Sequence, residues 1–191
     1  MPTAARSDVR LTYDDFLHFP EDGKRHELID GVHYVTPSPK LSHQELLGRL
    51  FLAIGNFLVG RRHLGRVFLS PFDVVLSHYD VVEPDLLFLA GDQLDILTDA
   101  NVQGPPALVV EILSRSTRKR DKGIKLRLFE QKGVREYWIV DPKGHRVTVF
   151  RRGDDGSFPR LMDLDEGQAA TLTTPLLPDF TLSIDDLFAP Y

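Results

Sequence analysis

A glutamate inside a strongly apolar stretch is the first residue whose position suggests chemistry. Glu111 interrupts the run ALVVEIL at residues 107–113, in which every other residue is aliphatic. Such a run is typical of a strand buried on both faces. A carboxylate there is costly unless it pairs with a cation or binds a metal. A structural ion pair is the alternative explanation.

A second carboxylate, Asp85, follows Pro84 within the strand-like run at residues 81–89. Proline inside such a run indicates a strand edge, a bulge or a strand start. Bulges often re-aim a side chain beside an active site. Glu83 is predicted to share a face with Asp85, because side chains alternate along a strand. A turn that carries a solvated aspartate is the alternative.

A lysine and an aspartate lie on the apolar side of the helix predicted at residues 117–132. At 100° per residue, Asp121 and Lys125 are one turn apart, among Ile124, Leu128 and Phe129. An inward lysine near Asp85 and Glu111 would balance their charge and stabilise charge developing on a phosphate. A lysine that snorkels at the helix edge is the alternative. The predicted exposed arc is Lys119, Arg120, Gly123, Arg127 and Glu130.

Basic residues are concentrated around the same helix, although the chain has a net charge of −5. This local charge suits contact with a phosphate backbone, and a solvated helix face is the alternative. The seven residues are Arg115, Arg118, Lys119, Arg120, Lys122, Lys125 and Arg127.

Composition limits the remaining classes of function. The 191 residues include no cysteine, so a metal would be held by Asp, Glu or His. No apolar run approaches the roughly 20 residues of a membrane helix, and the N-terminus lacks an apolar signal core, so we expect a cytoplasmic protein. The net acidity argues against a passive nucleic-acid coat, but metal-binding carboxylates would contribute to it.

The elements that position these residues form an α/β pattern. A helix is followed by several strands, and a helix then crosses from one apolar strand to the next, which predicts a mixed central β-sheet with helices on both faces. We expect a flexible arm at residues 1–10 and a single domain at 11–191. Helices are predicted at 13–19, 42–59 and 117–132, with a helical turn at 94–97 and a final turn at 184–188. A capping box of Ser42 and Glu45 opens the second helix, and Gly60 ends it. Strands are predicted at 25–29, 32–36, 66–70, 73–77, 81–89, 107–113, 136–140, 146–151 and near Leu172.

The acids and the lysine together resemble the metal site of PD-(D/E)XK nucleases. The residue two after Glu111 is Leu113, where the usual motif has lysine, and Lys125 on the next helix can replace it. The sequence most resembles the Uma-two family of restriction-endonuclease-like proteins, from about Tyr13 to Phe188. The segments that carry the resemblance are HELIDG at 26–31, EPDLL at 83–87, VVEILS at 109–114, DKGIK at 121–125 and EYWIVDP at 136–142.

The resemblance implies a restriction-endonuclease-like core and adds Glu27 to the site. Glu27, Asp85 and Glu111 are then the catalytic acids and the ligands of Mg²⁺ or Mn²⁺, since hard cations suit carboxylate oxygens. Lys125 is the basic catalytic partner. Asp121 is predicted to hold that lysine in place, and His43, Gln44 and Arg118 are candidate phosphate contacts.

The expected activity is metal-dependent endonucleolytic hydrolysis of phosphodiester bonds in DNA, by a homodimer. One alternative is a non-catalytic adaptor that uses the nuclease fold to bind nucleic acid or protein, because fold alone does not establish catalysis. A weaker alternative is a metal-dependent hydrolase of a small phosphoester. The presence of all four residues, Glu27, Asp85, Glu111 and Lys125, favours the enzyme.

Overall fold

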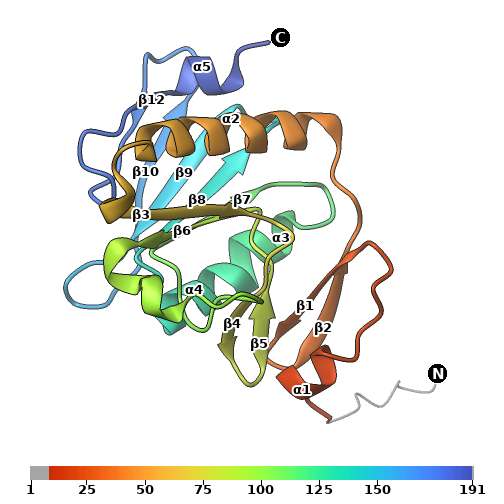
Figure 1. Ribbon diagram of the computed structural model, residues 1–191. Coiled ribbons are helices and arrows are strands. Elements are labelled where there is room, and N and C mark those ends of the chain that lie inside the picture. The colour runs from red at the N-terminus through yellow and green to blue at the C-terminus, as the bar shows by residue number, and fades with distance from the viewer. Residues whose placement is uncertain (1–8, 191) are drawn as a thin grey trace.

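Six strands form the main sheet of the protein, whose computed structural model describes residues 9–190 (Figure 1). Their order across the sheet is β10-β9-β8-β7-β6-β3. Only the central pair, β7 (Leu108–Ile112) and β8 (Glu136–Asp141), is parallel. The antiparallel strands are β3 (Gly65–Leu69), β6 (Leu86–Ala90), β9 (Arg146–Arg151) and β10 (Arg160–Asp165).

Alternation along β7 separates two apolar cores, one on each face of this sheet. Val110 and Ile112 pack in one core with the long helix α2 (Leu41–Leu58) and with α5 (Ile184–Phe188). Val109 points to the other core, which contains Leu128 and Phe129 from α4 (Leu126–Lys132). Helices therefore cover both faces, and the predicted α/β architecture with a mixed central sheet is confirmed.

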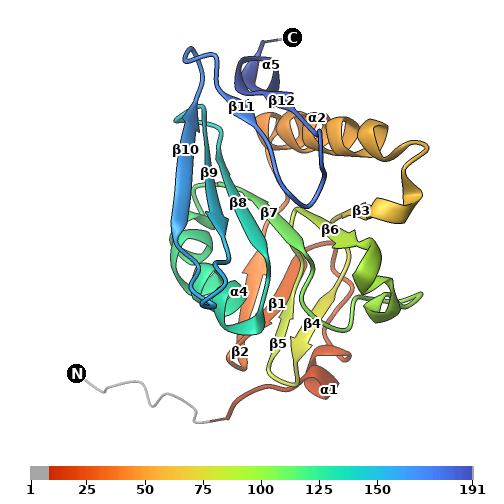
Figure 2. The ribbon, with the colours of Figure 1, turned by 90° about the vertical axis from the view of Figure 1, so that its left-hand side faces the viewer.

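A second, antiparallel sheet packs near the α4 side of the main sheet (Figure 2). Its strand order is β2-β1-β5-β4, and residues from β1, β4 and β5 share the core that holds Val109. The tight turn between β1 and β2 is the predicted one, since Asp30 and Gly31 both have positive φ. The strands are β1 (Arg25–Ile29), β2 (Val32–Thr36), β4 (Val74–Ser77) and β5 (Asp80–Val82).

Shorter elements complete the chain. Helix α1 (Tyr13–Phe16) begins at the predicted N-cap Thr12, and β11 (Thr171–Leu172) pairs with β12 (Leu182–Ser183). Two 3-10 turns span Arg62–Leu64 and Gly91–Ile96. Most of the predicted N-terminal arm, residues 1–8, lies outside the described residues. Among residues 9–190, none of the helices combines the length and the apolar composition that a membrane span requires.

Two predictions at element boundaries are wrong. Helix α2 begins at Leu41 with Lys40 as N-cap, so Ser42 and Glu45 lie inside the helix and form no capping box. A cap contributes only about 1 kcal/mol, and burial of the α2 face on the main sheet decides where the helix begins. The run at 81–89 is two strands, β5 and β6, which belong to different sheets.

Two strands and one irregularity are absent from the predictions. Strand β10 is an edge strand that keeps much of its surface exposed, so its alternation is weak, and β12 has only two residues. The helix predicted at 117–132 has three parts: α3 (Arg118–Arg120), a π-helical turn at Asp121–Lys125, and α4. π-Turns inside α-helices occur often at functional sites.

Candidate functional site

Asp85 lies where the chain crosses from the second sheet to the main sheet. Pro84 cannot donate a ladder hydrogen bond, and the strand is interrupted there. The Asp85 carboxylate accepts from the backbone N–H of Ile112 at 2.7 Å, beside the end of the β6–β7 ladder at Leu86 and Val110. This bond fixes the carboxylate next to Glu111, which precedes Ile112 in β7.

Two basic side chains also hold Asp85. Arg25 Nη1 lies 2.5 Å from Asp85 Oδ1, and His43 Nε2 lies 3.0 Å from Oδ2. Burial opposes ionisation, but the His43 hydrogen bond and the Arg25 charge outweigh it and lower the pKa of Asp85 to about 2. Asp85 is therefore ionised at neutral pH although it is only 1% exposed.

Lys125 joins two other buried acids. Its Nζ lies 2.5 Å from Glu111 Oε1 and 2.6 Å from Glu27 Oε1, and the lysine is fully buried. Burial disfavours the ammonium, but Glu111 and Glu27 outweigh it, so the pKa of Lys125 is raised. The π-turn and strands β1 and β7 thus bring a glutamate, a lysine and another glutamate into one line of contacts.

The two glutamates differ in their surroundings. Burial raises the pKa of Glu27, but Lys125 and Arg120 outweigh it, and the net pKa is lowered. For Glu111, burial dominates over Lys125, and the nearby Asp85 charge adds to it, so the pKa is raised well above its usual range. Glu111 is therefore the acid of this line that most needs further positive charge to stay ionised.

The whole cluster is short of positive charge. Five buried carboxyl groups, on Glu27, Glu83, Asp85, Glu111 and Asp121, are accompanied by three cationic side chains, on Arg25, Arg120 and Lys125. Full ionisation would leave two negative charges unbalanced. Consistently, burial raises the pKa of Asp121 and, helped by Asp73, raises that of Glu83 to about 7. Glu83 Oε2 and both Asp121 carboxylate oxygens are buried without a hydrogen-bond partner among the described residues.

Two cavities open beside the cluster. One, of about 360 Å³, is lined by Asp85, Glu83 and Lys24, and the other, of about 650 Å³, lies at the carboxyl end of β7. Arg25 and His43 line both cavities. Asp85 and Glu83 are therefore the acids of the cluster that line the smaller cavity.

The chain is similar to known proteins over most of its length. A family model described as "Uma2: Putative restriction endonuclease" matches residues 13–185. This chain belongs to the Uma2 family. An uncharacterized protein of Synechocystis is 27% identical over 152 residues, which cover 78% of both chains. The crystal structure of a "putative nuclease belonging to DUF820" from Anabaena variabilis has a TM-score of 0.78 and 22% identity, and covers 94% of this chain and 98% of its own.

The fold of this Uma2 protein is therefore the restriction-endonuclease-like α/β core that the sequence predicts. The structure brings Glu27, Glu111 and Lys125 into direct contact and places Asp85 beside them. Asp121 lies within the same cluster, but no hydrogen bond or ion pair among the described residues joins its carboxylate to Lys125. Its predicted role in holding the lysine stays a prediction.

The three candidate phosphate contacts have different surroundings. His43 is buried and bound to Asp85, so its ring faces the acid cluster. Gln44 is exposed and lines the smaller cavity. Arg118 pairs with Asp141 at 2.6 Å. Only Gln44 is thus exposed beside a cavity without a side-chain partner among the described residues.

Two cationic members of the cluster were not predicted. Arg25 lies two residues before Glu27, and the alternation rule would have placed both on one face of β1. Arg120 is predicted on the exposed arc, which is wrong: its side chain is 11% exposed, lies 3.3 Å from Glu27 Oε2 and stacks over Tyr34. A helix projection at 100° per residue assumes that the helix packs on one sheet. Here the β1–β2 hairpin covers the side of the helix that carries Arg120.

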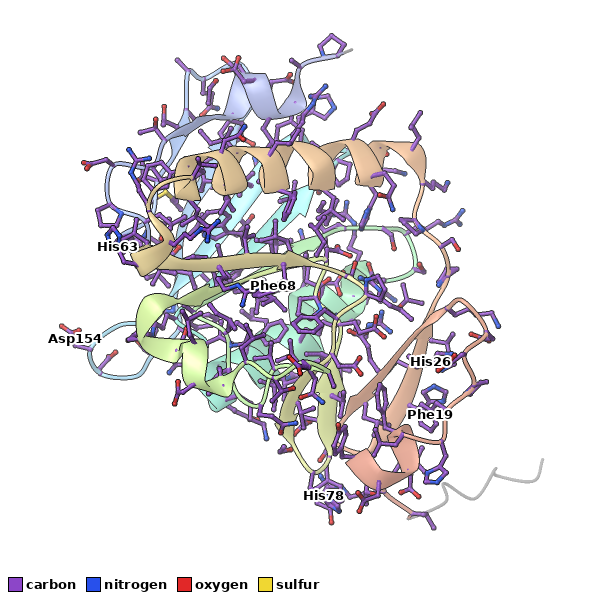
Figure 3. The ribbon with its side chains drawn as sticks, viewed as in Figure 1. Phe19, His26, His63, Phe68, His78 and Asp154 are labelled. Carbon is purple, nitrogen blue, oxygen red and sulfur yellow. The ribbon has the colours of Figure 1, made fainter. Side chains whose placement is uncertain are left out.

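The histidines of the hairpin belong to a separate cluster. His26 Nδ1 and His33 Nε2 are 2.9 Å apart, and Phe19 packs on both rings. Figure 3 shows Phe19 and His26 together beside the hairpin. Because His26 and Glu27 are consecutive in β1, they face opposite sides of the strand.

The cluster of this Uma2 protein fits a divalent cation in donor chemistry and in charge. Its carboxylate oxygens suit Mg²⁺ or Mn²⁺, and two missing positive charges equal one such ion. Asp85 and Glu111 are the acids that would hold it, with Glu27 as a third. Among the described residues, no three acidic or histidine side chains form a ready ligand cage, and Arg25 occupies Asp85 Oδ1.

Proposed function

We propose that this protein is a metal-dependent endonuclease that hydrolyses phosphodiester bonds in DNA. One observation carries the proposal: Lys125 is fully buried between Glu27 and Glu111 beside Asp85, and the surrounding carboxyl groups remain short of positive charge. An ion pair that only stabilises the fold needs no excess of acids. Membership of a restriction-endonuclease family supports the same activity.

Each side chain has a part in the proposed reaction. Asp85, which is ionised at neutral pH, and Glu111 would provide the oxygen ligands of the cation, with Glu27 as the third acid. A bound divalent cation would lower the pKa of a water molecule and neutralise charge on the scissile phosphate. Lys125, held between Glu27 and Glu111, donates hydrogen bonds that orient the attacking water or stabilise the negative charge of the transition state.

A non-catalytic adaptor is the second candidate, and one observation favours it. Both Asp85 oxygens already have partners, in Arg25, His43 and the N–H of Ile112. A cluster satisfied in this way would stabilise the fold without binding a metal. The two candidates differ in whether Arg25 releases Asp85 when a cation is present.

Cleavage assays with matched variants test the proposal. Purified protein is incubated with supercoiled plasmid and with single-stranded DNA in Mg²⁺, Mn²⁺ or chelator. We expect metal-dependent cutting that is reduced at least 100-fold in Asp85→Asn and Glu111→Gln. Glu136→Gln is the control, because Glu136 is also a buried acid (1% exposed), paired with Arg151 outside the cluster.

Equal cutting by all variants would show contamination and refute the assignment, and no cutting under any condition would favour the adaptor. We also propose a homodimer, because two paired sites would cut both strands of a duplex. Sedimentation velocity measures this directly, and a monomer at all concentrations would contradict it.

A further inference from the structure

The larger cavity differs from the acid cluster in its chemistry. Its volume is about 650 Å³, and its walls come from the β2–α2 connection, from the segment after β7 and from the turn after β8. In Figure 1 the β2–α2 connection passes beside the loop that follows β7. The cavity thus lies at the carboxyl ends of the two parallel strands, where α/β proteins commonly bind ligands.

Every charged residue that lines this cavity is cationic. Arg25, Lys40, Arg115 and Lys143 are in its walls, and no Asp or Glu is. The side chains of Lys40, Arg115 and Lys143 belong to exposed residues and make no ion pair among the described residues. Arg25 pairs with Asp85, so three cations of the wall are without an acidic partner among the described residues, and in a protein of net charge −5 they attract an anionic ligand to this place.

The other walls suit phosphate oxygens. Six residues with hydroxyl groups line the cavity, and hydroxyls and backbone N–H groups commonly bind phosphates alongside Arg and Lys. The contributing residues are Thr36, Ser38, Ser42, Ser114, Ser116 and Thr117. The ring of His43 and the cationic chain of Arg25 complete the wall nearest the acid cluster.

The cavity leads directly to the candidate catalytic acids. His43 and Arg25 line it and also contact Asp85, at 3.0 Å and 2.5 Å. Ile112 lines it as well, and its N–H donates to Asp85. Arg25 and His43 thus form a wall that both cavities share, and both side chains contact Asp85. A strand that reaches Asp85 through the smaller cavity can therefore continue into the larger one.

We propose that this cavity binds the phosphodiester backbone of the nucleic-acid strand next to the scissile phosphate, through Lys40, Arg115 and Lys143. The inference rests on the proposed function, because it names where that substrate lies. Of the basic residues at 115–127 that the sequence singles out, only Arg115 lines this cavity. Three of the seven basic residues have other contacts: Arg118 pairs with Asp141, Arg120 pairs with Glu27, and Lys125 is buried.

Two triple variants with equal loss of charge test the site. The cavity variant carries Lys40→Gln, Arg115→Gln and Lys143→Gln. The control carries Lys119→Gln, Lys122→Gln and Arg127→Gln, which removes three exposed cations from the helix face. Fluorescence anisotropy measures binding of a labelled 20-nucleotide strand and of its duplex, in chelator, across a salt series. Chelator prevents metal-dependent cutting, so binding is measured without the proposed reaction.

We expect the cavity variant to bind DNA at least tenfold more weakly and the control to stay within about threefold. Three lost phosphate contacts should lower the slope of log K against log salt by about 2 for a single strand and about 2.7 for a duplex. The charge-conserving variant Lys40→Arg, Arg115→Lys and Lys143→Arg should bind like the wild type, which separates lost charge from misfolding.

Equal losses in the two triple variants would overturn the inference, because binding would then follow overall charge. Tighter binding of poly-glutamate than of DNA would overturn it in favour of an acidic protein partner. Localised DNA binding without cleavage in metal would refute the proposed nuclease but leave this site intact. Absence of DNA binding would refute the site whatever the cleavage assay shows.

Discussion

Replacing Lys125 by methionine should destabilise the protein strongly and in a pH-dependent way. Lys125 Nζ is within 2.6 Å of Glu27 and of Glu111, and all three side chains are at most 2% exposed. Removing one partner of a buried ion pair costs about 3–5 kcal/mol, since it leaves an uncompensated charge. One lysine serves two carboxylates here, so we expect a loss in the upper part of that range at pH 7.5.

The sign of the pH dependence follows from Glu27. In the wild type its pKa is lowered, so its contribution to stability is present above the unfolded value of 4.5 and is lost as pH falls through the folded pKa. In Lys125→Met burial remains and the largest opposing charge is gone, so the pKa should rise above 4.5. The variant then loses stability as pH rises, and its deficit should be larger at pH 7.5 than at pH 5.

Urea unfolding followed by circular dichroism measures both effects. Lys132→Met is the control, because Lys132 lies on the same helix and pairs with Asp80 while 26% exposed, and its loss should cost about 1 kcal/mol or less. A Lys125→Met deficit no larger than that of the control, or one that is independent of pH, would refute the buried-pair reasoning.

Three further perturbations have defined outcomes. Arg25→Met should raise the pKa of Asp85, which in the wild type is lowered from 3.8 to about 2. This lowering contributes about 2 kcal/mol of stability above pH 3.8, and the contribution is lost as pH falls through 2. Acid unfolding of the variant should therefore begin at higher pH, and an unchanged acid midpoint would contradict this. Glu83→Gln should stabilise the protein by about 1–2 kcal/mol at pH 8 and hardly at pH 4, because a buried carboxyl group with a pKa of about 7 loses its neutral form as pH rises. Destabilisation of this variant at pH 8 in urea unfolding would argue against the prediction. Ile54→Ala removes a core side chain of α2 and should lower the free energy of unfolding by about 2–5 kcal/mol. Leu52→Ala, at a residue 60% exposed on the same helix, should change it by about 0.5 kcal/mol or less, and similar losses in urea unfolding would place Ile54 outside the core.

Local sequence patterns are sufficient to predict the charged residues that stand at apolar positions of a strand or a helix. Glu111 conflicts with an apolar strand, and Lys125 and Asp121 with an apolar helix face, so periodicity alone indicated all three. The structure confirms that they are buried. Asp85 was indicated by its proline, although the break proved to be a passage between two sheets.

Residues that depend on long-range pairing were harder to predict. Glu27 reaches the cluster because β1 pairs with β5 and lies against the crossover helix, so only the family resemblance indicated it. Arg120 was predicted to be exposed because a helix projection contains no second sheet. The sequence also does not indicate the π-turn at 121–125, since no residue there forbids a regular helix.

Direct titration of Mn²⁺ is the sharpest test of the central claim that the carboxylates around Lys125 hold a catalytic cation. Isothermal calorimetry would compare the wild type with Asp85→Asn, Glu111→Gln and the control Glu136→Gln. We expect one or two ions bound per chain in the wild type and in Glu136→Gln, with binding at least tenfold weaker in the other two variants. Absence of binding to the wild type, or equal binding in all four proteins, would contradict it.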